Sequence, residues 1–223
     1  MELHGLSPKK SFGQHFLLDP SIVARIAHLA GDLSHVSVIE VGPGPGGLTR
    51  ALLATSARKI FAVEIDTRAI PILEDLRQCN PDRLDIISAD AVTYDLATLG
   101  TAPRQIVANL PYNVGTKLLI NWLEQAGAWR RLTLMFQLEV AQRICAEVGT
   151  SAYGRLSVLA QWCAKCDIVM RVPAGAFSPP PKVDSAIVDL IPRMTSPRRS
   201  CFARWAASQE PLLVKDAKCS AAH

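Results

Sequence analysis

"VSVIEVGPGPGGLTRALLATS", residues 36–56, contains a continuous apolar run, then a turn rich in glycine, then a segment rich in leucine and alanine. A short apolar run that ends in glycine is typical of a strand buried on both faces of a sheet. Glycine permits a tight turn, and the residues after it favour a helix. We therefore predict a buried strand, a turn and a helix in this segment.

The same alternation of apolar runs and helical patterns continues through the chain. The sequence predicts further strands at 59–66, 83–90, 104–110 and 131–138, with a closing pair at 166–172 and 184–192. It predicts helices at 18–31, 46–56, 67–78, 114–126, 139–148 and 155–164, the first of them capped by Asp19. Alternating strands and helices predict an α/β fold: a doubly wound, mostly parallel seven-stranded sheet with helices on both faces.

The composition indicates a globular protein. The chain has 223 residues, of which 49% are hydrophobic and 20% are charged, so disordered and fibrous classes are excluded. It has no run of 18 apolar residues, and its first residues lack the apolar core of a signal peptide. The cysteines are scattered, and the pair Cys163 and Cys166 has no second pair of ligands, so we expect reduced thiols and no metal site. We expect a cytoplasmic protein that does not bind membranes.

The positive charge is concentrated at the end of the chain. The net charge is +4, and residues 193–223 hold six basic and two acidic side chains, so the rest of the chain is neutral. Bulk charge therefore gives only weak support for nucleic-acid binding. We predict one domain over 1–193, with an N-terminal arm and helix at 1–35, and a short basic tail at 194–223.

Polar residues follow the predicted strands where each strand ends. They are Glu40 and Gly42, Glu64, Asp90 and Asn109, in chain order. Ligands of parallel sheets bind beyond the carboxyl ends of the strands, so these residues are expected to surround one ligand. The 20 residues from Gly44 to Glu64 suit a carboxylate that accepts both hydroxyls of an adenosine ribose, and Asp90 suits the adenine amino group.

Two ligands are candidates for this site, and a tight strand–helix turn that binds no ligand is a third possibility. The glycine-rich turn formally matches the G-x-G-x-x-G pattern of nicotinamide dinucleotide enzymes. However, Pro43 and Pro45 remove two backbone N–H groups that would bind a pyrophosphate. S-adenosylmethionine has a ribose and an adenine but no pyrophosphate, so the sequence favours it as the cofactor.

"ANLPYNVGTKLL", residues 108–119, places an amide, a proline and an aromatic ring at the end of a predicted strand. It can be a plain turn, or it can hold a flat base. The exocyclic amine of adenine is a poor nucleophile, and acceptors on its N–H groups direct its lone pair at a methyl donor. We predict that the Asn109 amide oxygen and the Leu110 carbonyl are these acceptors, that Pro111 stiffens the turn and that Tyr112 stacks on the base.

Several motifs together resemble the ribosomal RNA adenine N6-dimethyltransferase family. They are "KKSFGQHFLLD", "EVGPGPGGLT", "VEID", "SADA", "NLPYNVGTKLL" and "FSPPPKVDSAIV", in this order over residues 9–192. The resemblance is greatest to the small-subunit members. It implies a Rossmann-like methyltransferase fold and the transfer of two methyl groups from S-adenosylmethionine to N6 of each of two adjacent adenosines near the 3′ end of 16S rRNA. The implied partner is the immature 30S subunit, bound by a monomer.

The resemblance also implies roles for individual residues. It implies that the cofactor contacts are His15, Leu17, Gly42, Gly44, Glu64, Asp90 and Asn109, and that Asn109, Leu110, Pro111, Tyr112 and Phe177 hold the base. Phe177 would stack on the second face of the base, although a core aromatic residue before a proline turn is the alternative. Many relatives have Asn at the position of His15, where a contact through the backbone would survive the change.

The tail departs from the family pattern, because members usually continue into a basic helical domain. Truncation, a shifted reading frame or divergence would each produce this, and we expect cofactor binding to survive while docking on ribosomes is impaired. Three other functions remain open: a methyltransferase of the resistance type that acts on 23S rRNA, a non-catalytic RNA-binding assembly factor that retains the fold, and a nicotinamide-dependent dehydrogenase.

Overall fold

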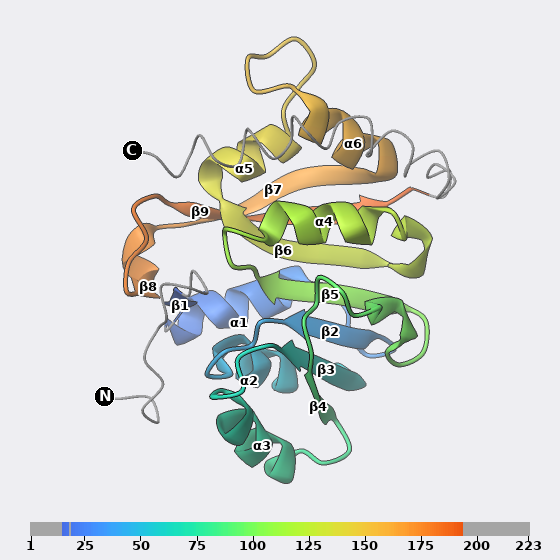
Figure 1. Cartoon of the computed structure of the whole chain (residues 1–223), viewed down its shortest axis with the longest axis vertical. Helices are drawn as coiled ribbons and strands as arrows, with labels where there is room; N and C mark the ends of the chain where they lie inside the picture. Colours follow the sequence, from blue (N-terminus) through green and yellow to red (C-terminus); the bar gives the residue numbers. More distant parts are fainter. Residues whose placement is uncertain (1–14, 18, 194–223) are drawn as a thin grey trace.

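The computed structural model describes residues 15–17 and 19–193 of the chain, and its main feature is a single seven-stranded sheet (Figure 1). The strands lie in the order β4–β3–β2–β5–β6–β9–β7. Their bounds are β2 (Ser37–Val41), β3 (Lys59–Glu64), β4 (Leu84–Ser88), β5 (Arg104–Asn109), β6 (Arg131–Gln137), β7 (Ala164–Val172) and β9 (Ser185–Pro192). Strands β2 to β6 are parallel, and β9 is antiparallel to both β6 and β7. The predicted α/β fold with a mostly parallel sheet is confirmed.

Helices cover both faces of the sheet, as predicted. They are α1 (Pro20–Leu29), α2 (Gly47–Leu53), α3 (Ile70–Cys79), α4 (Gly115–Leu123), α5 (Leu138–Ile144) and α6 (Arg155–Cys163), with short 3₁₀ turns η2 (Leu96–Thr98), η3 (Ala126–Ala128) and η4 (Ala174–Ala176). Buried side chains of α1 and α2 belong to one core cluster, and those of α4, α5 and α6 belong to another. The two clusters lie on opposite faces of the sheet, because neighbouring residues of one strand divide between them.

Strand β2 is at the centre of this arrangement. All five of its residues are buried, Val38 in the cluster with α1 and α2, and Ile39 in the cluster with α4. A strand buried on both faces needs apolar residues at every position, which explains the continuous apolar run. The polar exceptions are Ser37, whose hydroxyl donates to the Thr101 carbonyl, and Glu40 near the carboxyl end of the strand.

Three glycines of the turn between β2 and α2 have a positive φ, and at two of them an added side chain would also meet close neighbours. Gly44 and Gly46 have φ angles of +52° and +80°, in the region that side chains rarely adopt. A Cβ on Gly44 would lie 3.2 Å from Cε1 of Phe16, and one on Gly46 would lie 2.7 Å from Cδ1 of Leu76. The turn therefore packs tightly against the N-terminal arm on one side and against α3 on the other.

A second sheet of two very short strands was not predicted. Strand β1 (Phe16–Leu17) pairs antiparallel with β8 (Phe177–Ser178), with Leu17 opposite Phe177. Two residues are too few to show the period of a strand. The pairing brings the N-terminal arm beside the proline-rich loop between β7 and β9, at the carboxyl edge of the parallel strands.

The last described residue is Arg193, whose N–H donates to the Cys163 carbonyl at 2.9 Å. The tail predicted at 194–223 lies outside the described residues, and so do residues 1–14, which form most of the predicted N-terminal arm. In the part of the chain that the structure describes, no helix is both long enough and apolar enough to cross a membrane.

Candidate functional site

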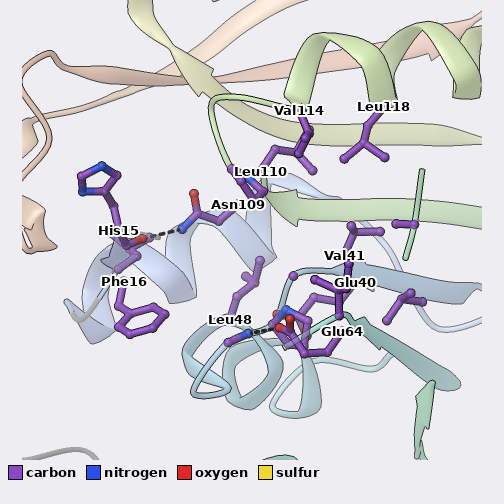
Figure 2. Close-up of a pocket in the computed structure, with 18 of the residues that line it drawn as sticks. His15, Phe16, Glu40, Val41, Leu48, Glu64, Asn109, Leu110, Val114 and Leu118 are labelled. Carbon is purple, nitrogen blue, oxygen red and sulfur yellow. Dashed lines mark hydrogen bonds between the residues drawn. The ribbon is translucent and has the colours of Figure 1, made fainter. Parts of the chain in front are cut away.

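A cavity of about 230 Å³ opens at the carboxyl ends of strands β2, β3 and β5 (Figure 2). Its walls come from the arm before α1, the β2–α2 turn, the loops after β3 and β4, and the segment between β5 and α4. It is lined by all the predicted cofactor residues and by four of the five predicted base-binding residues: His15, Leu17, Gly42, Gly44, Glu64, Asp90, Asn109, Leu110, Pro111 and Tyr112. The structure thus brings these residues together at the carboxyl edge of the sheet.

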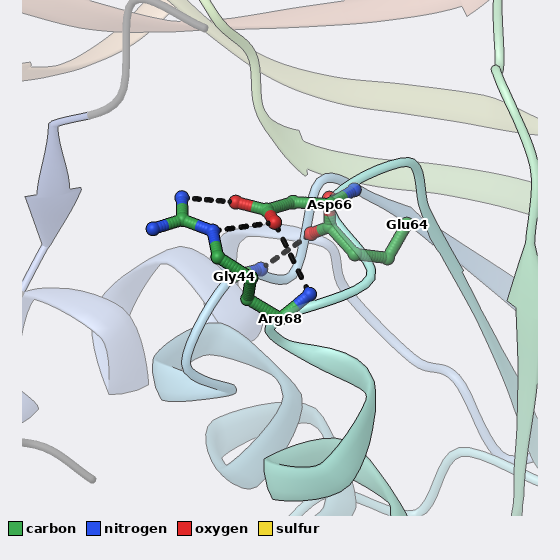
Figure 3. A network of polar contacts seen from close by, with 4 residues as sticks. All are labelled: Gly44, Glu64, Asp66 and Arg68. Atoms are coloured by element: carbon green, nitrogen blue, oxygen red, sulfur yellow. Dashed lines mark hydrogen bonds and ion pairs between the residues drawn. The ribbon is translucent and has the colours of Figure 1, made fainter. Parts of the chain in front are cut away.

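Glu64 is held rigidly at the end of β3. Only 4% of its surface is exposed, and its two oxygens accept the N–H groups of Gly44 at 2.9 Å and of Asp66 at 2.8 Å (Figure 3). Burial raises the pKa of Glu64, whereas the two backbone donors lower it. Each carboxylate oxygen retains a lone pair for a further donor, which suits a pair of ribose hydroxyls.

A second carboxylate beside Glu64 is neutralised by an arginine. Asp66 is 3% exposed, and Arg68 donates to it from Nε at 2.9 Å and from Nη2 at 2.6 Å (Figure 3). The negative charge of Asp66 raises the pKa of Glu64. The guanidinium of Arg68 offsets part of this charge.

Asp90 is exposed in the loop that follows β4. Its Oδ1 accepts the Val92 N–H at 2.8 Å, and the Val92 carbonyl accepts Nδ2 of Asn121 on α4 at 3.2 Å. Among the described residues, no hydrogen bond reaches the other oxygen of Asp90. The loop is therefore fixed by α4, and one carboxylate oxygen remains available to an N–H donor.

Glu40 is one of the residues expected around the ligand, but the sequence predicted no specific contact for it. It lines the cavity, is 1% exposed, and neither of its oxygens has a hydrogen-bond partner among the described residues. Burial raises the pKa of Glu40 to about 8, an effect that the Thr49 hydroxyl opposes and the charge of Glu64 reinforces. A buried carboxyl without a partner is costly unless a ligand completes it. The signal in the sequence was the single acid within the apolar run.

Ile65 is a residue to which no role was assigned. It follows Glu64 directly, lines the cavity, and is 52% exposed, which is unusual for a large apolar side chain beside two buried acids. Ala91 and Val92 line the cavity from the loop after β4. These side chains provide apolar surface beside the polar groups, as a flat purine requires.

The predicted base-binding corner is built as the end of β5 and the start of α4. Asn109 is half-buried, and its Nδ2 points to the His15 carbonyl at a long 3.5 Å, so its Oδ1 is free to accept (Figure 2). Leu110 is buried. The Pro111 carbonyl accepts the N–H groups of Val114 at 3.2 Å and Gly115 at 3.0 Å, which starts the helix. The corner is thus rigid on both sides.

Tyr112 is fixed by contacts at both its hydroxyl and its ring. The hydroxyl lies 2.6 Å from Oγ of Ser185 on β9, and burial raises its pKa. Its ring stacks with the imidazole of His15, with centroids 5.5 Å apart and planes inclined by 28°. Nδ1 of His15 also lies 2.8 Å from the Pro179 carbonyl. The sequence predicted His15 as a cofactor contact, but its ring faces the base-binding corner.

Phe177 is the one predicted site residue that does not line the cavity. It is 5% exposed and packs in the core cluster that contains α1 and α2. In this state of the chain its ring is unavailable to a base. Its assignment to the second face of the base stays a prediction.

The donor set of the cavity fits S-adenosylmethionine and does not fit a pyrophosphate. The buried acids Glu40 and Glu64 suit a ligand with positive charge and hydroxyl donors. Pro43 and Pro45 offer no N–H, and the N–H of Gly44 is already bonded to Glu64. Within residues 15–17 and 19–193, no group of three or more His, Cys, Asp or Glu side chains is placed to hold a metal ion. The fold and the site together define an S-adenosylmethionine-dependent methyltransferase.

The chain belongs to the family described as ribosomal RNA adenine dimethylase, whose model matches residues 5–217. It is 61% identical over 202 residues to ribosomal RNA small subunit methyltransferase A of Gluconobacter oxydans, which covers 91% of this chain and 67% of the relative. The protein of the same name from Sphingopyxis alaskensis is 58% identical over 196 residues, covering 86% of this chain and 72% of the relative. The chain thus spans about two thirds of the length of these relatives.

Solved structures agree with this assignment. A dimethyladenosine transferase from Plasmodium falciparum superposes with a TM-score of 0.73 at 34% identity, covering 82% of this chain and 65% of the other. The 23S rRNA methyltransferase ErmE superposes with a TM-score of 0.71 at 31% identity, covering 87% of this chain and 77% of the other. The predictions of the family, of methyltransferase activity and of S-adenosylmethionine as cofactor are confirmed.

Proposed function

We propose that this chain transfers methyl groups from S-adenosylmethionine to N6 of two adjacent adenosines near the 3′ end of 16S rRNA in the small ribosomal subunit. The observation that carries the proposal is the position of the Asn109–Tyr112 corner on the same cavity as Glu64 and Glu40. The names of the small-subunit relatives, at 54–61% identity, support this choice of rRNA.

One half of the cavity holds the cofactor. When bound, S-adenosylmethionine supplies a methyl group on a positively charged sulfur. Glu64 accepts the ribose hydroxyls with the lone pairs that Gly44 and Asp66 leave free. The free oxygen of Asp90 accepts the adenine amine, and Ile65 covers the purine ring. Glu40 receives the ammonium group, which satisfies its unpaired oxygens and favours its ionised form.

The other half holds the target base. Oδ1 of Asn109 and the Leu110 carbonyl accept the two N–H hydrogens of the adenine amine, which directs the nitrogen lone pair at the methyl group. The Tyr112 ring, held by its bond to Ser185, stacks on the base. No strong general base is needed, since the methylated nitrogen is acidic enough to release its proton to water.

The test is mass spectrometry of small-subunit rRNA incubated with the protein and labelled cofactor. We expect dimethyladenosine with the wild type and a loss of at least about 100-fold in rate with Asn109→Ala, by analogy with the removal of one preorganised hydrogen-bonding group from an active site. Binding of S-adenosylhomocysteine should remain. The matched control is Gln142→Ala, which removes an exposed amide on α5 and should leave the rate unchanged.

Other outcomes of the same assay identify the alternatives. Methylation of 23S rRNA in place of 16S rRNA would identify the resistance-type activity. Binding of S-adenosylhomocysteine and of RNA without any methylated product would identify a non-catalytic assembly factor. An unchanged yield with Asn109→Ala would remove Asn109 from its assigned role.

We further propose that the partner is the immature 30S subunit and that a monomer acts on it in the cytoplasm. Residues 1–193 form the methyltransferase domain in this proposal, and the tail at 194–223 stands in place of the helical domain that helps other family members to dock. A filter-binding comparison with a full-length relative tests the tail. Weaker retention of immature subunits by this chain is expected, and equal retention would refute the expectation.

A further inference from the structure

Tyr112 borders two hollows of very different size. Among the described residues, one is the cavity of about 230 Å³, and the other is a hollow of about 10 Å³ behind the Asn109–Tyr112 corner. The second has room for about one water molecule. A target base therefore reaches the Tyr112 ring from the large cavity, which His15 also lines.

The imidazole of His15 already stacks on the Tyr112 ring, and both residues line the large cavity. The two ring centroids are 5.5 Å apart. Carbon atoms in contact are about 3.5–4.0 Å apart, so a purine between two parallel rings needs a centroid separation of about 7 Å. The observed spacing is too short, so one of the two rings must move before a base can stack on the face of Tyr112 that His15 covers.

The contacts of the two rings indicate which one moves. Tyr112 is anchored at its hydroxyl by Ser185, which is fully buried on β9, and it follows Pro111 at the start of a helix. Among the described residues, the imidazole of His15 is anchored by its hydrogen bond to the Pro179 carbonyl and by the stack itself. Because a carbonyl can only accept, Nδ1 of His15 carries the proton in this bond.

We propose that the His15 imidazole is a placeholder, which covers the base-binding side of Tyr112 in the free protein and is displaced by the target adenine. This inference rests on the proposed function. The proposal assigns the side chain of His15 to the base-binding half of the site and not to the cofactor half. Entry of the base breaks the His15–Pro179 hydrogen bond. The proposal concerns the imidazole alone, and the His15 carbonyl stays beside Nδ2 of Asn109.

The test measures binding of a base without methyl transfer. Adenosine 5′-monophosphate is titrated into wild type, His15→Ala and the control His28→Ala, each saturated with S-adenosylhomocysteine so that the cofactor site is closed to the probe. His28 is an exposed histidine on α1. We expect His15→Ala to bind the nucleotide about five- to tenfold more tightly, because one stacking contact and one hydrogen bond no longer need to break. His28→Ala should equal the wild type.

Two results would overturn the proposal. Equal or weaker nucleotide binding by His15→Ala would show that the imidazole does not compete with the base. A tenfold loss of S-adenosylhomocysteine affinity in this variant would show that the side chain is a cofactor contact.

A measurement on the wild type does not depend on whether the variant folds. The Nδ1–H resonance of His15 in nitrogen-correlated NMR spectra should shift or broaden as the nucleotide is added, and an unchanged resonance would also refute the placeholder. Neither measurement involves turnover. A failure of the proposed methylation in the rRNA assay is therefore distinguishable from a failure of this inference.

Discussion

Glu40 makes the stability of the protein depend on pH. Its pKa is about 8 in the folded state, against an ordinary value of 4.5 for an unburied glutamate. Between these values the folded chain holds a proton that the unfolded chain has released. The free energy of unfolding therefore contains a contribution that is fully present below pH 4.5 and is lost as the pH rises to about 8.

We predict that Glu40→Gln removes this pH dependence. Thermal unfolding between pH 5 and 8.5 should show the wild-type melting temperature falling relative to that of the variant, by several degrees at the upper end. Glu147→Gln, at an exposed position, should follow the wild type. Parallel curves for wild type and Glu40→Gln would mean that the carboxyl is already ionised at neutral pH.

Arg68 controls a neighbouring carboxyl from outside the cavity. Arg68→Ala removes the guanidinium that donates to Asp66, and the charge of Asp66 raises the pKa of Glu64. Ribose hydroxyls donate to an ionised carboxylate. As the pH falls, we therefore predict that the variant loses affinity for S-adenosylhomocysteine at a higher pH than the wild type does, with an affinity about three- to tenfold lower at the acidic end of the range.

Calorimetric titration from pH 5.5 to 8.5 measures this effect. The matched control is Arg77→Ala, which breaks a more exposed ion pair with Glu74 on α3. Identical pH profiles for Arg68→Ala and the wild type would show that Asp66 does not influence the ionisation of Glu64.

The sequence predicted the backbone positions of the site better than the orientations of its side chains. Glu64, Asp90 and Asn109 follow strands, and the ends of parallel strands must meet at one edge. No such rule gives the rotamer of His15, whose imidazole turns to Tyr112, or the burial of Phe177. Both depend on the pairing of two segments that are distant in the sequence.

At the level of single elements, the turn between β2 and α2 links stability to ligand binding. Gly44 has a φ of +52° and donates its N–H to Glu64. We predict that Gly44→Ala lowers the free energy of unfolding by about 1–2 kcal/mol, because the left-handed conformation is costly for alanine. The new Cβ also presses on Phe16, so the affinity for S-adenosylhomocysteine should fall as well.

Denaturant unfolding and cofactor titration of the same preparation measure both effects. Gly127→Ala is the matched control, since a Cβ on Gly127 meets no atom within 4 Å. A stable Gly44→Ala variant with unchanged cofactor affinity would show that the turn relaxes without moving Glu64.

The type of most elements could be predicted from local sequence patterns. The elements that were missed have no such pattern. Strand β2 was predictable because each of its residues is buried, and α1 because Asp19 caps it with bonds to Ser21 and Ile22. Strands β1 and β8 have two residues each and exist only through their mutual pairing. A pattern that depends on a partner 160 residues away is not visible in a local window.

At the scale of the whole molecule, one ion pair joins β6 to β9. Arg131 donates to both oxygens of Asp189, at 2.5 Å and 2.9 Å, and Asp189 is 4% exposed. We predict that Asp189→Leu lowers the free energy of unfolding by about 3–5 kcal/mol, because Arg131 is left without its partner. The midpoint of thermal unfolding should fall by roughly 6–20 °C.

The double variant Arg131→Met with Asp189→Leu separates charge from packing. It should recover most of the loss, since a buried ion pair and a well-packed apolar pair are often equal in stability. If the double variant is no more stable than Asp189→Leu, packing at this position and not the unpaired charge determines the result.

The order of the sheet was only partly predictable. Alternating strands and helices fixed the class, because parallel neighbours need a crossover helix. The insertion of β9 between β6 and β7 follows from no local signal, since it reverses chain direction within the sheet. Seven strands were expected, but their spatial order was known only from the structure.

The reversed direction of β9 leads the chain away from the methyl-transfer site. Ser185, its first residue, bonds to Tyr112, whereas Pro192, its last, is opposite Ala164. Eight residues of extended strand span roughly 26 Å. Arg193, the last described residue, therefore lies at the rim of the sheet remote from the reaction centre.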